Sequence, residues 1–285
     1  MFAAAALVSA QSHALQIVVD DFDGGADVRV TGTTITPDTG FPTFLGSIFD
    51  VFGPTDRTAN FDFADDSVEG NDNPNSFPTD SIGVAPYSTY PEGQMFFGVE
   101  DLDNPDNNPG VGGGMATWTV DITGLSNLTL LMNFSAMGDF EEGDNSHTFE
   151  ASIDGGASQL LFAINGNNDT DFTYTMESGT EFVLPDPLEL TDDLGTRVID
   201  NSFTLQGQAA IEGTGSELVL TYTAGQNNGG DEPFAFDNII LSDEIAPPVD
   251  DADLDQDGDV DGDDYLKVQQ DQIELTAVWQ ATYGS

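Results

Sequence analysis

The sequence predicts an all-β protein, an antiparallel β-sandwich of the jelly-roll kind, followed by a small C-terminal α-helical segment. Three observations lead to this prediction. From about residue 16 to residue 242, short β-rich runs alternate with clusters of Gly, Pro, Asn and Asp. Several of these runs alternate apolar and polar residues with a period of two, which is typical of a strand with one buried face. Helical spacing of apolar residues begins only after residue 260.

The period-two pattern is clearest in four runs. In the run 147–154, the apolar residues occupy alternate positions and so share one face. The runs 127–134, 171–176 and 217–222 alternate in the same way. Asp154-Gly155-Gly156 follows the first run and predicts a tight hairpin, because these residues tolerate positive φ. Many short strands joined by such turns favour a sandwich architecture.

The chain is strongly acidic, with 52 acidic residues against 4 basic ones and a formal net charge of −48. Because so few basic residues could neutralise phosphates, nucleic acid and anionic membrane surfaces are excluded as partners. The hydrophobic fraction of 38% and the 20 Phe residues are sufficient for a packed core. Self-repulsion on this scale opposes compaction, so we expect stability to depend on divalent metal, on salt, or on both.

The chain divides into four predicted parts. Residues 1–14 form an apolar run that ends in small residues, which is typical of a secretory signal and predicts a secreted protein of the cell surface or matrix. Residues 15–243 form the sandwich domain. Residues 244–252 contain Pro247-Pro248 and are predicted to be a stiff linker. Residues 253–285 form the C-terminal segment.

The segment 253–264, "DLDQDGDVDGDD", is predicted to be a calcium loop. Carboxylates at alternating positions can curl around one ion, and Gly258, in the sixth position, permits the sharp turn that brings the later ligands back. Val260, in the eighth position, is predicted to anchor the loop, and the twelfth position is Asp where the template prefers Glu. The predicted calcium ligands, with the seventh position contributing its backbone carbonyl, are Asp253, Asp255, Asp257, Asp259, Asp261 and Asp264.

Together with the following "LTAVWQATYG", this loop resembles the EF-hand loops of dockerin-type segments at the C-termini of many secreted bacterial proteins. The resemblance is confined to the end of the chain. It implies a cohesin-like or scaffold protein as partner. The second half, 271–285, has a helix-like pattern but contains no second loop of this kind. A calcium-locked stalk or surface module is therefore an equal alternative.

The main domain begins with "IVVDDFDGG" and closes with "EPFAFDNIIL". In these first and last stretches it resembles the jelly-roll domains of carbohydrate-binding modules. The resemblance implies a structural calcium shared by Asp21 or Asp23 with Asp237, which would clamp the first strand to the last. The residues alone permit a second interpretation, in which Asp237-Asn238 ends an edge strand with a turn. The acidic stretches 100–103 and 139–144 could hold metal, but in a chain this acidic they are interpreted as solvated loops.

A small set of aromatic residues could hold a ligand. Trp118 is interpreted either as a core residue or as a platform on which a sugar ring stacks. Tyr87 and Tyr90 lie in a loop and are candidates for exposure. His147 is the single histidine outside the predicted signal and lies at the start of a strand, so we interpret it as structural and predict no catalytic residue.

The predicted function is that of a secreted, calcium-binding, non-catalytic surface or matrix protein that acts in adhesion or extracellular assembly, including self-assembly. The alternative is a carbohydrate-binding module that holds an extracellular glycan and is attached through the dockerin-like tail. A glycoside-processing enzyme is a third possibility, which would require two carboxylates in a cleft. An assembly protein should expose edge strands that can pair, whereas a binding module should expose aromatic side chains along a groove or a sheet face.

Overall fold

The structure is a computed structural model, and it describes residues 16–36, 51–56, 95–100, 102, 113–140, 146–175, 181–225 and 233–243. The chain divides into two units, Met1–Glu244 and Ile245–Ser285, and all described residues belong to the first. The predicted signal, the linker and the calcium loop therefore lie outside the described residues. No helix that could cross a membrane occurs in the described part of the chain.

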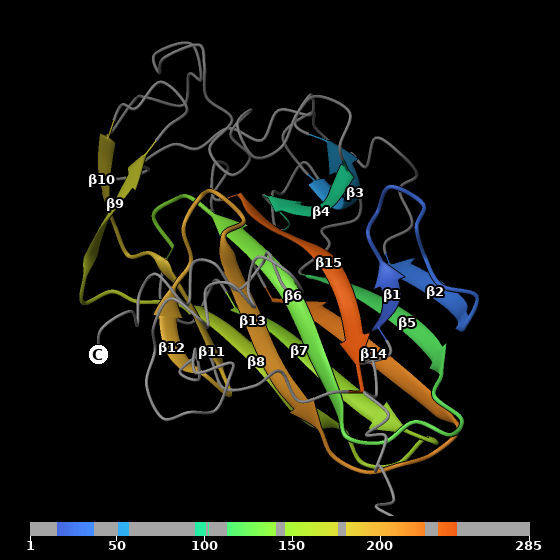
Figure 1. Cartoon of the computed structure of the whole chain (residues 1–285). Helices are drawn as coiled ribbons and strands as arrows, with labels where there is room; N and C mark the ends of the chain where they lie inside the picture. The colour runs from blue at the N-terminus through green and yellow to red at the C-terminus, as the bar shows by residue number, and fades with distance from the viewer. Residues whose placement is uncertain are drawn as a thin grey trace, which may run out of the picture. The chain divides into compact units, whose positions relative to one another are not determined.

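The regular elements of the described residues are strands, arranged in two large antiparallel sheets and one separate hairpin (Figure 1). Sheet A has the order β13-β6-β15-β4-β3, with β1 also paired to β15. Its strands are β1 (Gln16–Asp20), β3 (Val51–Asp56), β4 (Met95–Glu100), β6 (Leu128–Ala136), β13 (Leu205–Ile211) and β15 (Phe234–Ser242).

Sheet B has the order β12-β11-β8-β7-β14-β5-β2. Its strands are β2 (Val30–Thr36), β5 (Gly114–Asp121), β7 (Ser146–Ile153), β8 (Gln159–Gly166), β11 (Leu188–Asp192), β12 (Gly195–Val198) and β14 (Glu217–Ala224). The separate hairpin consists of β9 (Asp171–Thr175) and β10 (Glu181–Pro185).

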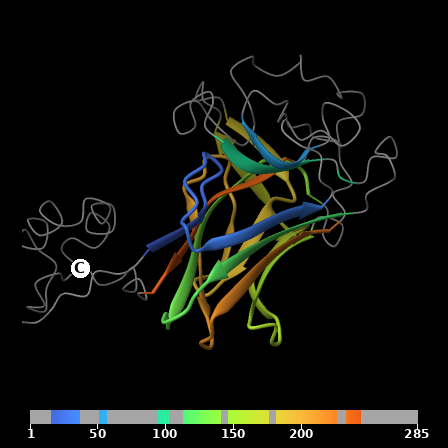
Figure 2. The same ribbon diagram turned by 90° about the vertical axis from the view of Figure 1, so that its right-hand side faces the viewer.

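The core lies between the two sheets, which Figures 1 and 2 show as two layers. Phe97 and Phe236 of sheet A stack with ring centroids 4.7 Å apart. From sheet B, Phe149 and Tyr222 meet the ring of Phe236 at 5.0 and 4.8 Å in edge-to-face geometry. The predicted all-β fold of antiparallel sheets is confirmed, and a core shared by two sheets is the arrangement of a β-sandwich.

The runs with period-two alternation form strands where the sequence predicts them. The run 147–154 gives β7, and its apolar positions Phe149 and Ala151 face the core. Asp154 and Gly155 adopt φ values of 50° and 68° and turn the chain into β8, which confirms the predicted hairpin. The runs 127–134, 171–176 and 217–222 overlap β6, β9 and β14. Alternation located β7 and β14 because each has one face against the core.

The first and last strands of the described sandwich are neighbours. β1 pairs antiparallel with the C-terminal half of β15, where Gln16 lies opposite Ser242. β4 pairs with the N-terminal half of β15 along the same edge. The last of these pairs is Phe236 opposite Phe97. β6 occupies the other edge of β15. The adjacency of first and last strands that the calcium clamp requires is thus present.

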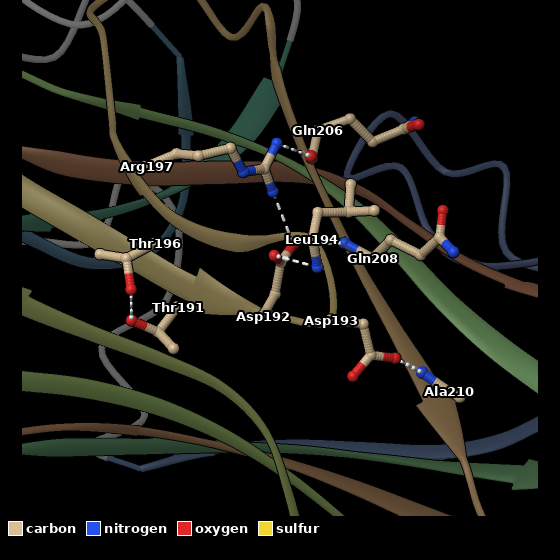
Figure 3. A network of polar contacts seen from close by, with 9 residues as sticks. All are labelled: Thr191, Asp192, Asp193, Leu194, Thr196, Arg197, Gln206, Gln208 and Ala210. Carbon is tan, nitrogen blue, oxygen red and sulfur yellow. Dashed lines mark hydrogen bonds and ion pairs between the residues drawn. The ribbon is translucent and has the colours of Figure 1, made fainter. Parts of the chain in front are cut away.

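The outer edge of β13 is closed by side chains from sheet B (Figure 3). Asp192 accepts hydrogen bonds from the backbone N–H of Gln208 at 2.8 Å and from Arg197 at 2.6 Å. Arg197 in turn donates to the backbone carbonyl of Gln206 at 3.1 Å. These side chains bond backbone groups that an added strand would otherwise use.

The same closure continues along β13 (Figure 3). Asp193 accepts from the N–H of Ala210 at 2.6 Å. The amide of Gln159 behaves like a peptide group, because its nitrogen donates to the carbonyl of Ala210 at 2.7 Å and its oxygen accepts from the N–H of Glu212 at 2.9 Å. This edge of sheet A is therefore protected against pairing with another chain.

Candidate functional site

The predicted calcium clamp falls at the point where β4 and β1 meet on the edge of β15. We call Asp20, Asp21, Asp23, Asp237 and Asn238 the strand junction. Asp23 accepts a hydrogen bond from the backbone N–H of Met95 at 3.0 Å, which ties the turn after β1 to the first residue of β4. The junction thus joins three strands that are distant in the sequence.

Asp20 is the acid of this region that points toward the core, and the sequence analysis did not single it out. Its carboxylate accepts from the indole N–H of Trp118 at 2.9 Å and from the backbone N–H of Phe22 at 2.9 Å. Burial raises the pKa of Asp20 above its ordinary value, and these two hydrogen bonds only partly offset that effect. Asp21 instead stabilises the turn, because it accepts from the backbone N–H groups of Asp23 and Gly25 at 3.1 and 2.6 Å.

Asp237 and Asn238 form a bulge inside β15. The pairing of β15 shifts between Asp237 and Ile240, and Asn238 adopts a φ of 54°. Asp237 is buried, with 1% of its surface exposed, and accepts from the side-chain amide of Asn238 at 3.0 Å. The interpretation of these two residues as the end of an edge strand is wrong, since β15 continues to Ser242 between strands on both sides.

The described residues contain no group of three or more His, Cys, Asp or Glu side chains placed to hold one metal ion. Asp21 and Asp23 lie in the turn after β1, whereas Asp237 is buried within β15. The clamp therefore stays a prediction. So do the six loop ligands between residues 253 and 264, which lie outside the described residues.

Replacing Asp20 by asparagine tests the electrostatics of the junction. With EGTA at pH 7, the Asp20→Asn variant is expected to melt up to about 4 °C above the wild-type protein. A neutral side chain is cheaper to bury and retains an oxygen for Trp118, and this gain should exceed the loss of the hydrogen bond from the backbone N–H of Phe22. Because folding raises the pKa of Asp20, the folded state binds the proton more readily, and the wild type should regain stability relative to the variant as the pH falls toward 3.8.

Asp121→Asn is the matched control for thermal unfolding at both pH values. Hydrogen bonds from Thr123 lower the pKa of this exposed carboxyl, so its removal should reduce stability at pH 7, the opposite sign. A lower melting temperature for Asp20→Asn in EGTA would contradict the expected charge penalty. If Asp21 or Asp23 shares calcium with Asp237, calcium should raise the melting temperature of the wild type and of Asp20→Asn, and fail to raise that of Asp237→Asn.

A second feature, on the outside of sheet B, is a surface on which hydroxyl groups from several strands lie side by side. The row Trp118, Leu220 and Ala151 faces the core, so the alternate positions of β5, β14 and β7 face outward. Three adjacent strands each carry a Thr-x-Thr sequence with both threonines outward. We call this surface the hydroxyl face, and it consists of Thr34, Thr36, Thr117, Thr119, Thr148, Ser152, Thr221 and Thr223.

The register aligns these hydroxyls into rows across the strands. Thr34 lies opposite Thr117, and Thr117 lies opposite Thr221. In the next row Thr223 lies opposite Thr148. Neighbours in a row are separated by the strand spacing of about 4.8 Å, and same-face neighbours along a strand by about 6.7 Å. The spacing is regular because it is set by the backbone of the sheet.

The hydroxyl face carries little charge for a chain of net charge −48. On the outward positions of β2, β5, β14 and β7 the acids are Glu150 and, at one end, the opposed pair Asp121 and Glu217. Glu150 lies opposite Thr221 and accepts from the hydroxyl of Ser158 at 3.0 Å. The centre of this face therefore presents hydroxyl groups and a single carboxylate, together with the apolar side chains of Met115 and Val219.

The aromatic candidates of the sequence do not form a ligand platform in the described residues. Trp118 is fully buried and packs 6.3 Å from Phe97, so it belongs to the core, and the exposed-platform interpretation is corrected. The alternation with Ala116 and Val120 placed it on the inward face. Tyr87 and Tyr90 lie outside the described residues.

Two acids assigned to solvated loops are buried. Glu100 is the last residue of β4, pairs with Val51 of β3 and is 0% exposed. Asp139 is 6% exposed. The sequence pattern missed this because the chain's many acids gave no local signal for burial.

His147 is a core residue. Its Nδ1 lies 2.8 Å from the hydroxyl of Tyr222, and its ring stacks on Phe234 with centroids 4.3 Å apart. Its Nε2 is buried without a hydrogen-bond partner among the described residues. Burial lowers the pKa of His147 to about 3, so the ring is neutral at pH 7.

No protein-family model matches the sequence, and no curated protein matches it. Among solved structures, the chain is similar to the CBM22-1 xylan-binding domain of Xyn10C from Paenibacillus barcinonensis. The identity is 11%, the match covers 55% of this chain and 78% of that chain, and the TM-score is 0.21.

Proposed function

We propose that this chain is a secreted, non-catalytic binding module that holds a neutral extracellular glycan on the hydroxyl face of sheet B. The observation that supports the proposal is the presence of aligned rows of threonines with few charges, in a chain of net charge −48. In this proposal the sandwich is a jelly roll of the carbohydrate-binding kind. The dockerin-like tail, with calcium in its EF-hand loop, attaches the module to a surface or scaffold.

The chemistry of the hydroxyl face fits a neutral polyol. Each threonine hydroxyl donates one hydrogen bond and accepts others, which matches the donors and acceptors of a sugar ring. Glu150 adds one charge-assisted acceptor for a sugar hydroxyl. Threonine is β-branched and stiff at χ1, so ordering these side chains on binding costs little entropy.

Electrostatics selects against anionic polymers. An anionic polysaccharide would be repelled by the net charge of the chain, and the repulsion would be only partly screened at physiological ionic strength. A neutral glycan carries no such cost. The absence of aromatic side chains on the described hydroxyl face means that hydrogen bonds, not ring stacking, would provide the recognition.

Calcium-dependent structural assembly outside the cell is the second candidate function. It is supported by the excess of 52 acidic over 4 basic residues, because divalent cations can bridge carboxylates of neighbouring chains and neutralise part of this charge. Assembly through such bridges would require divalent metal, whereas glycan binding by the hydroxyl face would not.

The test is retention of the full chain on insoluble neutral polysaccharides, with anionic polysaccharides as comparison. The double variant Thr117→Val, Thr221→Val removes two hydroxyls while keeping β-branched side chains, and we expect it to bind at least about tenfold more weakly, as two lost hydrogen bonds predict. The control is Thr173→Val, which removes an exposed hydroxyl from the separate hairpin.

Three results would overturn the proposal. They are the failure of every neutral polysaccharide to retain the chain, equal retention of the double variant and the wild type, and release of soluble sugar from the bound polymer. The last result would indicate a glycoside-processing enzyme.

A further inference from the structure

The edge strands β13 and β2 differ in whether side chains bond their outer backbone groups. β13, at the end of sheet A, has its outer backbone groups bonded by Asp192, Asp193, Arg197 and Gln159. β2 is the last strand of sheet B, and within the described residues it pairs only with β5. Alternate N–H and C=O groups of an edge strand point away from its neighbour, and this row is a template for another strand.

The sequence of β2, "VTGTTIT", lacks most features that protect an edge. It contains no charged residue and no proline, and five of its seven residues are exposed. Edge strands are usually protected by charged side chains, prolines or bulges. The pairing irregularity of β2 lies at its beginning, between Val30 and Gly32, so Gly32–Thr36 remains as a regular run.

We propose that β2 pairs antiparallel with β2 of a second copy of this chain, so that two copies of sheet B form one continuous sheet. A two-fold axis beside β2 places residues of the same face opposite one another. Gly32, Thr34 and Thr36 of both copies would therefore share the outer face. The rows of the hydroxyl face would then run across two copies.

The absence of acidic residues in this segment favours a second copy of β2 as the strand that pairs with the edge of β2. Residues 28–36 include Arg29 and no acid, whereas the chain as a whole carries −48. Symmetric pairing through an acidic strand would set carboxylates of the two copies opposite one another, and like charges directly opposite in a sheet are destabilising. β2 is thus a segment at which two copies can meet without facing carboxylates.

The remaining repulsion between the two copies gives the pairing a salt dependence. The Debye length falls from about 10 Å at 0.1 M salt to about 3 Å at 1 M. Association through β2 should therefore strengthen with salt, because the screened term is the repulsion between copies and the ladder itself is uncharged. Association through opposite charges would weaken under the same conditions.

The experiment is sedimentation equilibrium of the full chain with EGTA present, at about 0.1 M and about 1 M sodium chloride. EGTA removes any calcium-bridged assembly. The wild type should form dimers, and their dissociation constant should fall at least about tenfold at the higher salt. Thr34→Asp and Thr36→Asp each place a carboxylate on β2 and should weaken the dimer at least about tenfold.

Thr223→Asp is the matched control, because Thr223 is an exposed threonine of the same face on β14, two strands in from the edge. It should dimerise as the wild type does and lose retention on neutral polysaccharides. A monomer at both salt concentrations, or a dimer that withstands Thr34→Asp and Thr36→Asp in folded protein, would overturn the β2 pairing. Failure of glycan binding is measured separately in the retention assay and would leave the dimer result unaffected.

Discussion

The Phe97→Ala variant is expected to unfold with a free energy about 3–5 kcal/mol lower than the wild-type protein. Phe97 is fully buried at the centre of the sandwich. Its ring stacks on Phe236 of the same sheet and meets Phe52 at 5.1 Å and Tyr222 of sheet B at 5.7 Å. Alanine would leave a cavity among rigid rings that the surrounding strands can close only in part.

Urea unfolding at constant ionic strength measures this loss, since the salt holds the repulsion of the −48 charge constant. The control is Val183→Ala on β10, where the side chain is 62% exposed and the change should stay within about 0.5 kcal/mol. If Phe97→Ala cost less than about 1 kcal/mol, the shared aromatic core described above would be incorrect.

Acid is expected to destabilise the wild-type protein through His147. The folded state lowers the pKa of this histidine from 6.5 to about 3 because the ring is fully buried, so between these values the unfolded chain binds a proton that the folded chain does not. The stabilising contribution is complete above pH 6.5 and is lost as the pH falls toward 3, and the total is on the order of 4 kcal/mol.

His147→Gln isolates this contribution, because glutamine does not titrate and can still form a hydrogen bond with Tyr222. The difference in unfolding free energy between wild type and variant should be constant above pH 7. It should shift against the wild type by up to about 1.4 kcal/mol for each pH unit below about 6. Protonation of the many carboxylates affects both proteins and cancels in the difference. A difference that does not vary with pH would show that His147 is accessible to protons in the folded state.

Local pattern was enough to locate strands whose two faces differ in burial. Phe149 and Ala151 of β7 alternate with polar residues because one side of the strand faces the core, and the adjacent Asp154-Gly155 turn fixes the hairpin. The burial of Trp118 also follows from its alternation with Ala116 and Val120. Local pattern could not show which strands are neighbours, because β2, β5 and β14 are widely separated in the sequence.

The same limit explains what the sequence analysis missed at the sites. The Thr-x-Thr sequences of β2, β5 and β14 are visible in the sequence, but only the sheet register brings Thr34, Thr117 and Thr221 into one row. In the first part of the strand junction, residues 20–23 include three aspartates. The register shift between Val18 and Asp20 decides which of them approaches Trp118, and such a shift leaves no compositional signal.

The pairing of β1 with β15 also determines how the domain would respond to mechanical tension. Gln16 lies opposite Ser242, so force applied between these two points would separate the β1–β15 pairs one at a time, as a zipper opens. Force applied through the chain beyond Ser242, against a load held on sheet B, would instead act along β15. Its ladder with β6 extends from Phe234 to Ser242, so these hydrogen bonds would be sheared together. A module tethered through its C-terminal end would therefore bear load along a strand that pairs with three others, β1, β4 and β6.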